Sequence, residues 1–547
     1  MRRPRTLSRL LVAVSAAALL AGCGTAVTGR AVSVFEDPFK VGGLQATDGP
    51  TGLRPDAKAE SRTVNGTDGG EVDTLAGQSV SDLEEFWKFA YPDTFDGELT
   101  PVRALYSWDS DAYRGTFCGD TTEGLVNAGF CEKDNTIGWD RTVLMPSLRN
   151  AYGDMAITMV LAHEYGHALQ KQAALNPRGV PTLVAEQQAD CLAGVYLRWV
   201  AEGKSPRFTL STGEGLNNLL AAMISFRDPL LSENDYYDAG DEHGSAFERI
   251  SAFQFGFTDG AAACAGITIK EIKERRGELP VELPGDQTGE LPVTKASVKA
   301  LVDALNLMFT PKEPPTLSFD AGAASTCPDA RPSPPASFCP ASNTITVDLP
   351  ALAAIGTPSE GIDGPPLQGD NTAYSALTSR FMMALQHQRG GVSLDNAEAG
   401  LRTACLTGVA TTKLSKKVTT PDGDTVALTA GDIDEAVSGL LTNGLAAGDV
   451  NGESVPAGFS RIDAFRVGVL GDEERCFKRF ECRLPPSVAP ERHRAPGVTL
   501  ERRWSEAPAV TRLWWRRTRT GSRRRICPIC SERRRSARTT PPRSRRF

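Results

Sequence analysis

The pattern of apolar and polar positions predicts two adjacent helices in the first half of the chain. The run MAITMVLA before His163 is apolar enough for a buried helix, which Asp154 can cap and Asn176-Pro177 ends. Between Pro181 and Gly203, residues at helical spacing form a second apolar stripe, consisting of Leu192, Val195, Tyr196 and Trp199. The two helices together carry most of the candidate chemistry of the chain.

The segment before these helices divides into a polar part and a helical part. Residues 42–72 are rich in Gly, Thr, Asp and Pro and lack a sustained apolar period, which is typical of a flexible spacer. Ser81 and Glu84 then have the spacing of a capping box. We therefore expect ordered structure to begin with a helix near Ser79.

The first 23 residues have the features of an export signal. Four arginines precede an apolar run, Leu10–Leu20, that is too short to span a membrane as a mature helix. The run ends in Leu20-Ala21-Gly22-Cys23, which resembles the lipobox of bacterial lipoproteins, where the cysteine is lipid-modified and becomes the first mature residue. The alternative is an ordinary signal peptide with an incidental cysteine. We expect an exported protein, anchored to the outer face of the cytoplasmic membrane through a lipid on Cys23.

Five segments of the first half recur in the second half, in the same order and at offsets between 208 and 218 residues. For example, HALQKQ at 167–172 corresponds to MALQHQ at 383–388, and ADCLAGV at 189–195 corresponds to TACLTGV at 403–409. We interpret this repetition as a tandem duplication. The predicted division is a signal peptide (1–22), a flexible spacer (23–74), a first domain (75–270), a linker (271–292), a degenerate repeat (293–482) and a basic, disordered tail (483–547).

Charge is distributed unevenly along the chain. The net charge is −7, yet residues 484–547 contain 18 Arg, no Lys and 4 acidic residues. Such a tail could bind nucleic acid or a membrane, but GC-rich coding sequence read out of frame also produces Arg-, Pro- and Ala-rich sequence. The CxxC pair at Cys527 and Cys530 lacks the second ligand pair of a zinc site. We expect no nucleic-acid binding.

The repeat also predicts how eight of the 12 cysteines pair. Corresponding cysteines suggest one short and one long bridge in each copy, and export would permit disulfides. The alternative is buried free thiols, and Cys482 has no predicted partner. The predicted bridges are Cys118–Cys131, Cys191–Cys264, Cys327–Cys339 and Cys405–Cys476.

The segment HEYGH at 163–167 has the spacing of a zinc site. Residues four apart share one face of a helix, so His163 and His167 can bind one metal ion, with Glu164 beside it as a base for water. In the next predicted helix Glu186 and Asp190 are again four apart. Glu186 can act as the third ligand, and Asp190 can accept the outer N–H of a ligand histidine. The alternatives are two surface histidines and a solvated carboxylate at position 186.

Three segments resemble a bacterial family of neutral zinc metallopeptidases of the HExxH-plus-glutamate type: HEYGHALQ, the following E-Q-Q-A-D-C-x-A-G, and EHGSAFERISAFQFGF at 242–257. The resemblance covers about residues 115–265 and is closest to copies in actinobacterial lipoproteins. It implies a zincin-like fold, Zn²⁺ held by His163, His167 and Glu186, and Glu164 as general base. We therefore expect an α+β, predominantly helical fold, with a zincin-like domain followed by a degenerate tandem copy.

A peptidase of this kind also needs a hydrogen-bond donor for the oxyanion of the tetrahedral intermediate. His243 is our candidate, because the predicted 191–264 bridge would tie its loop to the zinc helix. A surface-loop histidine is the alternative, and Tyr165 and Tyr236 are weaker candidates for the role. By analogy with zincins, we expect the peptide to pair with an exposed edge strand at residues 135–140.

The second copy lacks these chemical groups. When the repeats are matched, Ser379 and Met383 stand at the positions of His163 and His167, and Arg380 stands at the position of Glu164. Gly400, Ala404 and Val455 stand at the positions of Glu186, Asp190 and His243. We therefore expect one Zn²⁺ per chain and an inactive second domain. The favoured function is hydrolysis of peptides or proteins in the cell envelope. The alternatives are a binding or scaffold lipoprotein, and zinc-dependent hydrolysis of a non-peptide amide.

Overall fold

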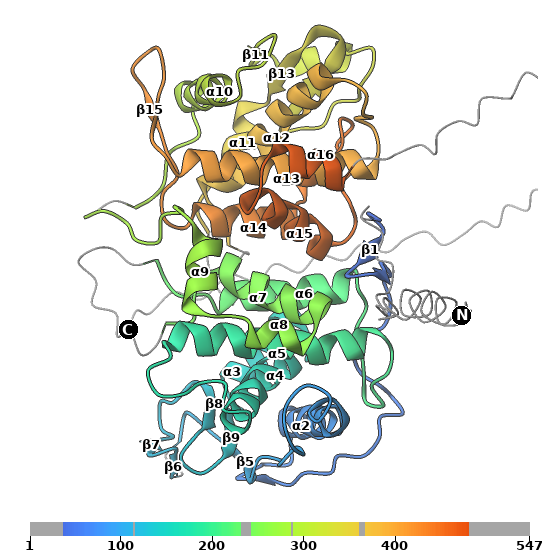
Figure 1. Ribbon diagram of the computed structural model, residues 1–547, viewed down its shortest axis with the longest axis vertical. Coiled ribbons are helices and arrows are strands. Elements are labelled where there is room, and N and C mark those ends of the chain that lie inside the picture. Colours follow the sequence, from blue (N-terminus) through green and yellow to red (C-terminus); the bar gives the residue numbers. More distant parts are fainter. Residues whose placement is uncertain (1–36, 113–114, 231–241, 286–287, 360–366, 481–547) are drawn as a thin grey trace, which may run out of the picture. The chain divides into compact units, whose positions relative to one another are not determined.

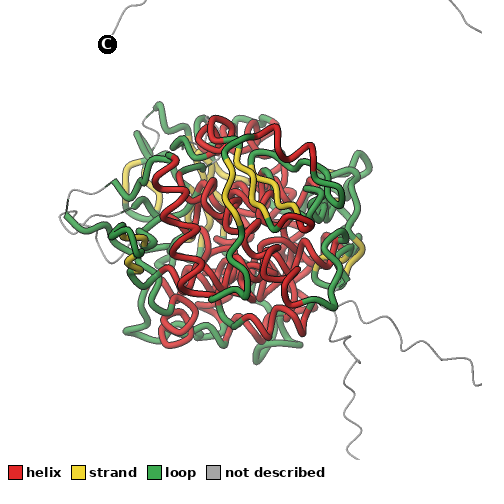
Figure 2. Tube along the Cα trace, turned by 90° about the horizontal axis from the view of Figure 1, so that it is seen from above, coloured by secondary structure: helices red, strands yellow, loops and turns green. Residues whose placement is uncertain are grey.

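The computed structural model describes residues 37–112, 115–230, 242–285, 288–359 and 367–480 (Figure 1). About half of the residues are helical and the strands between them are short (Figure 2), so the α+β class is confirmed. The described residues all belong to one compact unit. Within the described ranges, no helix is both long and apolar enough to cross a membrane. Cys23, Tyr236, Cys482, the signal peptide and the basic tail lie outside these ranges.

The first half contains a four-stranded sheet in the order β4-β5-β9-β8, in which only β8 is antiparallel to its neighbour. Its strands are β4 (Val64–Asn65), β5 (Ala104–Trp108), β8 (Ala128–Cys131) and β9 (Thr136–Asp140). Three two-stranded pairs are β1 (Lys40–Val41) with β2 (Leu44–Gln45), β3 (Gly52–Leu53) with β10 (Phe208–Thr209), and β6 (Thr116–Phe117) with β7 (Asp120–Thr121). The helices are α2 (Glu71–Ala90), α3 (Leu144–Tyr152), α4 (Asp154–Gln172), α5 (Thr182–Ala201), α6 (Glu214–Ser225), α7 (Ala246–Asp259), α8 (Ala261–Ala265) and α9 (Ile269–Arg276).

The two predicted helices that carry the candidate site are α4 and α5. Helix α4 begins at Asp154, but its N-cap residue is Gly153 at φ 85°, and Asp154 instead pairs with Arg149 at 2.8 Å. Helix α5 follows Pro181 as expected. Both helices are buried along most of their length, which explains why their apolar residues are not confined to one narrow face.

Strand β9 is not the exposed edge that we expected at residues 135–140. It lies between β5 and β8, and all five of its residues are buried. Ile137 and Trp139 enter the main core, while Gly138 on the opposite face lies against the rings of Trp108 and Phe117. Because it pairs with a strand on each side, β9 is a central strand, and the edges of this sheet are β4 and β8.

Ordered structure also begins earlier than the composition suggested. Strand β4 joins the main sheet beside β5, and helix α2 starts at Glu71 rather than near Ser79. The Ser81 hydroxyl is inside this helix, where it donates to the Gly77 carbonyl and accepts from Ser61 N–H. Residues 37–74 are therefore packed against the first half over several short strands, in a range assigned above to a flexible spacer.

The second half contains a three-stranded sheet in the order β11-β13-β12. Its strands are β11 (Thr316–Ser318), β12 (Ala336–Cys339) and β13 (Thr344–Val347), and a separate hairpin pairs β14 (Val418–Thr419) with β15 (Thr425–Val426). The helices are α10 (Lys295–Phe309), α11 (Leu349–Ile355), α12 (Asp370–Arg389), α13 (Ala397–Leu414), α14 (Asp432–Thr442), α15 (Gly458–Val469) and α16 (Glu473–Arg479). Short 3₁₀ turns are η1 (Ala321–Thr326), η2 (Pro340–Ser342) and η3 (Leu445–Ala447).

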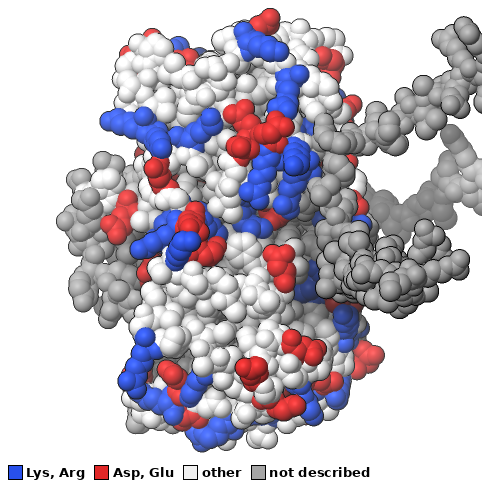
Figure 3. Space-filling model, viewed as in Figure 1, with Lys and Arg blue, Asp and Glu red and all other residues white. Residues whose placement is uncertain are grey.

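Four disulfides join the cysteines in the predicted pairs. Each half has one short bridge at its sheet and one long bridge between helices, with Cα atoms 5.4–5.7 Å apart. The bridges are Cys118–Cys131, Cys191–Cys264, Cys327–Cys339 and Cys405–Cys476. On the face drawn in Figure 3, basic and acidic residues are interspersed rather than segregated by sign.

Candidate metal centre

The candidate centre lies where α4 and α5 pack closely against each other. Gly166 stands between the two histidines of HEYGH, and a Cβ at this position would lie only 2.9 Å from the Cα of Ala189 in α5. A larger residue would therefore force the helices apart. The close approach brings Glu186 and Asp190 of α5 against the histidines of α4.

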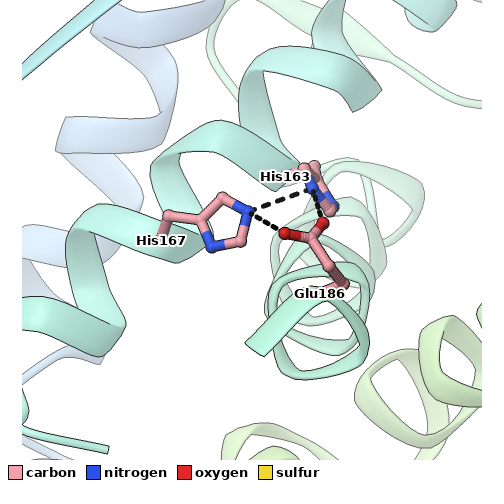
Figure 4. A group of neighbouring side chains, drawn as sticks. All are labelled: His163, His167 and Glu186. Carbon is pink, nitrogen blue, oxygen red and sulfur yellow. Dashed lines mark hydrogen bonds and ion pairs between the residues drawn. The ribbon is translucent and has the colours of Figure 1, made fainter. Parts of the chain in front are cut away.

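Two imidazoles and one carboxylate converge at this point (Figure 4). His163 Nε2 lies 3.2 Å from His167 Nε2 and 3.1 Å from Glu186 Oε2, and His167 Nε2 lies 3.4 Å from Glu186 Oε1. Tetrahedral zinc with bonds near 2.0–2.1 Å requires ligand atoms about 3.3 Å apart. The donor types and their separations therefore fit zinc.

Neighbouring side chains orient both histidines with Nε2 toward this point. His163 Nδ1 lies 2.8 Å from Asp190 Oδ1, and His167 Nδ1 lies 3.0 Å from Gln170 Oε1. A proton on each Nδ1, donated to these oxygens, leaves each Nε2 with the lone pair that a metal needs. Arg249 of α7 in turn holds Asp190 through Nε and Nη2, each at 2.9 Å.

The charges of the centre favour a cation. Burial lowers the pKa of His163, but the charges and hydrogen bonds of Asp190 and Glu186 outweigh burial and raise this pKa to about 10. Burial raises the pKa of Glu186, but hydrogen bonds from His163 and His167 outweigh burial and hold this pKa well below its usual range. Carboxylates that keep a proton so firmly on a buried imidazole also supply the negative charge that a divalent cation needs.

Glu164 extends from α4 toward the edge strand β8. Its Oε2 accepts a hydrogen bond from Phe130 N–H at 2.8 Å. Burial raises the pKa of Glu164, and the charges of His163 and His167 offset part of that rise. A carboxyl group whose pKa is raised toward neutrality is better able to accept a proton and return it.

His243 lies beside the third ligand, in the loop before α7. Its Nε2 is 3.7 Å from Glu186 Oε2, and its side chain is 43% exposed. Asp228 holds the other side of this residue: Oδ1 lies 3.4 Å from His243 Nδ1, and Oδ2 accepts the backbone N–H at 2.9 Å. The hydrogen bond with Asp228 raises the pKa of His243 despite its partial burial.

The structure thus brings together the residues that the sequence singled out, namely His163, Glu164, His167, Glu186, Asp190 and His243. Tyr165 is the exception among those described. It is two positions from each ligand histidine on α4, which directs it to the opposite side of the helix, and it is buried near Glu84. Tyr165 is therefore not placed to stabilise an oxyanion.

Sequence reasoning missed the groups that orient the chemical residues. Gln170 could have been found, because it is three positions after His167 and so shares its helical face. Asp228 and the Phe130 N–H could not, since no spacing rule connects them with His243 or Glu164. Arg249 could not be found either, because its ion pair with Asp190 depends on how α5 packs against α7.

Two histidines and a glutamate on neighbouring helices, with a second glutamate beside the first histidine, define the class of HExxH metalloproteins. Residues 17–267 match the family described as "Putative neutral zinc metallopeptidase". The family resemblance inferred from the motifs is therefore confirmed over this part of the chain.

Two curated relatives each match about a third of the chain. The chain is 29% identical over 180 residues to the Escherichia coli protein YpfJ, which covers 29% of this chain and 61% of that protein. It is 29% identical over 200 residues to the Mycobacterium tuberculosis protein Rv2575, which covers 32% of this chain and 64% of that protein. The chain thus spans less than two-thirds of the length of these relatives. No solved structure matches the chain.

Proposed function

We propose that this protein is a zinc-dependent peptidase that hydrolyses peptide bonds in peptides or proteins of the cell envelope. The observation that carries the proposal is the triangle of side chains His163, His167 and Glu186. The two histidine Nε2 atoms lie 3.2 Å apart, and one oxygen of Glu186 lies 3.1 Å from His163 Nε2 while the other lies 3.4 Å from His167 Nε2, which suits a single zinc ion. Glu164 beside this triangle supplies the base, and the family match supports the same chemistry.

Each residue of the centre has a separate task in this reaction. When bound, zinc would polarise the substrate carbonyl and make water nucleophilic at neutral pH. Glu164 accepts the proton of the attacking water and returns it to the leaving amine. His243 in its protonated form, which Asp228 favours, donates from Nε2 to the developing oxyanion. Asp190 and Gln170 keep the two ligand histidines in orientation.

The substrate would bind as an extended strand along β8 rather than along residues 135–140. Strand β8 pairs with β9 on one side only among the described strands. On its other side Phe130 N–H is directed toward α4, because it donates to Glu164. A peptide added at this edge would lie beside the base and could use the remaining backbone groups of β8 for hydrogen bonds.

The second half is, in this proposal, a degenerate copy of the first. Strands β11, β13 and β12 repeat the arrangement of β5, β9 and β8, with one parallel and one antiparallel pairing. Gly194 of α5 packs against the Phe253 carbonyl of α7, and Gly408 of α13 packs against the Phe465 carbonyl of α15. The same close helix contact at matching positions supports a common origin.

The proposed copy would not bind zinc. Gly400 stands where the first half has Glu186, and the Ser379 hydroxyl, at the place of His163, donates to the Ala376 carbonyl. Arg380, at the place of Glu164, donates to the carbonyl of Ala336 in β12 at 2.7 Å. A buried cation thus takes the position of the base and contacts the strand that corresponds to β8.

Export and anchoring complete the proposal. The lipobox-like sequence ending in Cys23 would attach the protein to the outer face of the cytoplasmic membrane. The four disulfides support this location, because such bonds persist in oxidising compartments. The substrate would then be met outside the cytoplasm.

The decisive experiment is cleavage of a denatured protein by the purified full-length chain. It compares the wild type, Glu164→Gln, a chelator-treated sample and the same sample after zinc is restored. Glu132→Gln is the matched control, since Glu132 is an exposed glutamate directly after β8. We expect cleavage to be lost on Glu164→Gln and on chelation, restored by zinc, and unaffected by Glu132→Gln.

Other results would redirect the proposal. A folded protein that holds one zinc per chain but cleaves no peptide would indicate hydrolysis of a non-peptide amide. A folded protein that binds no zinc would contradict the enzyme and leave the scaffold function. Cleavage by Glu164→Gln at the wild-type rate would remove this residue from its role as base.

A further inference from the structure

A carboxylate of the second half lies at the loop that carries His243. Asp434 belongs to α14 and is 3% exposed. Its Oδ2 accepts a hydrogen bond from Ala246 N–H at 3.1 Å, and its Oδ1 accepts one from Phe247 N–H at 3.0 Å. These are the first two N–H groups of α7, the helix that follows His243. Figure 1 shows α14 and α7 as neighbours from the two halves.

The N-terminus of α7 is capped both by its own residues and by Asp434. Ser245 and Glu248 form a capping box, which occupies the backbone N–H groups of these same two residues. The N–H groups of Ala246 and Phe247 lie between them and are not served by that box. Asp434 accepts both, so the second half satisfies two N–H groups at the start of α7 that its own capping box does not serve.

The same carboxylate also contacts the other segment of the loop. Arg227 Nε lies 3.7 Å from Asp434 Oδ2, and Arg227 directly precedes Asp228. Asp228 accepts the N–H groups of His243 and Gly244 at 2.9 and 2.7 Å, and donates its own N–H to the Gly244 carbonyl at 3.1 Å. Asp434 therefore reaches both segments that hold His243.

We propose that Asp434 is a positioning residue for His243, through which the metal-free second half takes part in the centre of the first. Its carboxylate fixes the start of α7 and the Arg227–Asp228 segment, so that His243 Nε2 stays beside Glu186. This inference deepens the proposed peptidase function, and its kinetic part rests on that function. It gives the second half a task that needs none of the zinc ligands.

The test uses the full-length zinc-loaded chain with Asp434→Ala, Asp434→Asn and a matched control. The asparagine has the same shape and keeps one of the two acceptor oxygens. The control is Asn217→Ala, which also removes a hydrogen bond between the halves, because Asn217 Oδ1 accepts Gly458 N–H at 2.9 Å. Asn217 lies on α6, and no hydrogen bond connects its side chain with the His243 loop among the described contacts.

Three readouts separate positioning from general destabilisation. The first is kcat and KM measured separately, together with zinc content. The second is hydrogen exchange of the backbone at residues 243–250, measured by mass spectrometry. The third is the ring signal of His243 in an NMR spectrum of histidine-labelled protein, which has five histidines and is assigned with His243→Gln.

We expect Asp434→Ala to lower kcat between about tenfold and a hundredfold, as misplacement of a catalytic group does, with KM and zinc content within about twofold of wild type. Exchange at Ala246 and Phe247 should accelerate and the His243 signal should shift or broaden. Asp434→Asn should give a smaller change of the same kind, and Asn217→Ala none.

Two results would overturn the proposal. One is wild-type exchange and an unchanged His243 signal in both Asp434 variants. The other is an equal effect of Asn217→Ala, which would show that any weakening of the contact between the halves suffices. If the wild-type chain cleaves nothing, the peptidase function fails, but exchange and the His243 signal still decide whether Asp434 positions the loop.

Discussion

Replacing Asp190 with asparagine should separate the metal affinity of the centre from the stability of the fold. The carboxylate is fully buried and serves two partners, His163 Nδ1 at 2.8 Å and the Arg249 guanidinium at 2.9 Å through each oxygen. Burial raises the pKa of Asp190, but Arg249 and His163 lower it below its usual value, so the group is charged at neutral pH. Asparagine keeps the shape, removes the charge and turns one acceptor into a donor that must face His163 or Arg249.

Two separate losses follow from these contacts. Removing one member of a buried ion pair costs about 3–5 kcal/mol, because the remaining charge stays buried, and Arg249 is only 4% exposed. Removing the outer partner of a ligand histidine weakens metal binding about 10- to 100-fold, or about 1.4–2.7 kcal/mol. The double change Asp190→Asn with Arg249→Met removes both charges, so it should recover most of the stability without recovering the metal affinity.

Denaturant unfolding of the metal-free protein measures the first loss, and competition with a chelator of known zinc affinity measures the second. Asp82→Asn is the matched control. Asp82 lies on α2, remote from the ligands, and is a fully buried partner of Arg207. It should reduce stability and leave zinc affinity unchanged. If Asp190→Asn binds zinc as tightly as wild type, or if the double variant regains affinity along with stability, Asp190 does not orient His163.

Three further predictions concern the whole chain. Zinc analysis should find one ion per chain, and none after His163→Ala. Burial, followed by neighbouring carboxylates, raises the pKa of Asp370 to about 7 and that of Glu435 to about 9. The stability that each protonated group contributes is complete below its pKa in the unfolded chain, near 4, and is lost as the pH rises through its pKa in the folded protein. The loss is at most about 1.4 kcal/mol per pH unit for each group. The midpoint of unfolding should therefore decrease as the pH rises from 5 to 9, and this decrease should be smaller in Glu435→Gln. Replacing Cys405 and Cys476 with alanine should lower the unfolding free energy by about 2–5 kcal/mol, measured with denaturant.

The ligands and the disulfides could be predicted because both follow from rules of spacing. A four-residue interval on a helix places His163 beside His167, whatever the rest of the fold does. The pairing of Cys191 with Cys264 followed from an internal repeat, which supplied the second observation that a single list of cysteines lacks. Local sequence was enough in both cases.

The strand that borders the centre could not be predicted, because its place depends on packing over both faces of a sheet. Residues 135–140 were expected at an exposed edge by analogy with zincins, yet Phe117 and Trp108 cover the outer face at Gly138. These rings come from β6 and β5, and no local pattern places them there. The contact of Phe130 N–H with Glu164 follows from the same arrangement, since β8 becomes an edge only when β9 is central.

In the proposed degenerate copy, packing as well as the absence of ligands would prevent metal binding. A Cβ at Gly400, the proposed counterpart of Glu186, would lie 2.5 Å from the Ala447 carbonyl, so η3 occupies the space that a larger side chain at this position would need. Arg461, at the proposed counterpart position of Arg249, donates to the Leu441 carbonyl, and burial lowers its pKa to about 10. Restoring ligands alone would leave this space filled. Most residues of α14 are buried, so the helix that carries Asp434 is held in place on several sides, as the proposed positioning of the His243 loop requires.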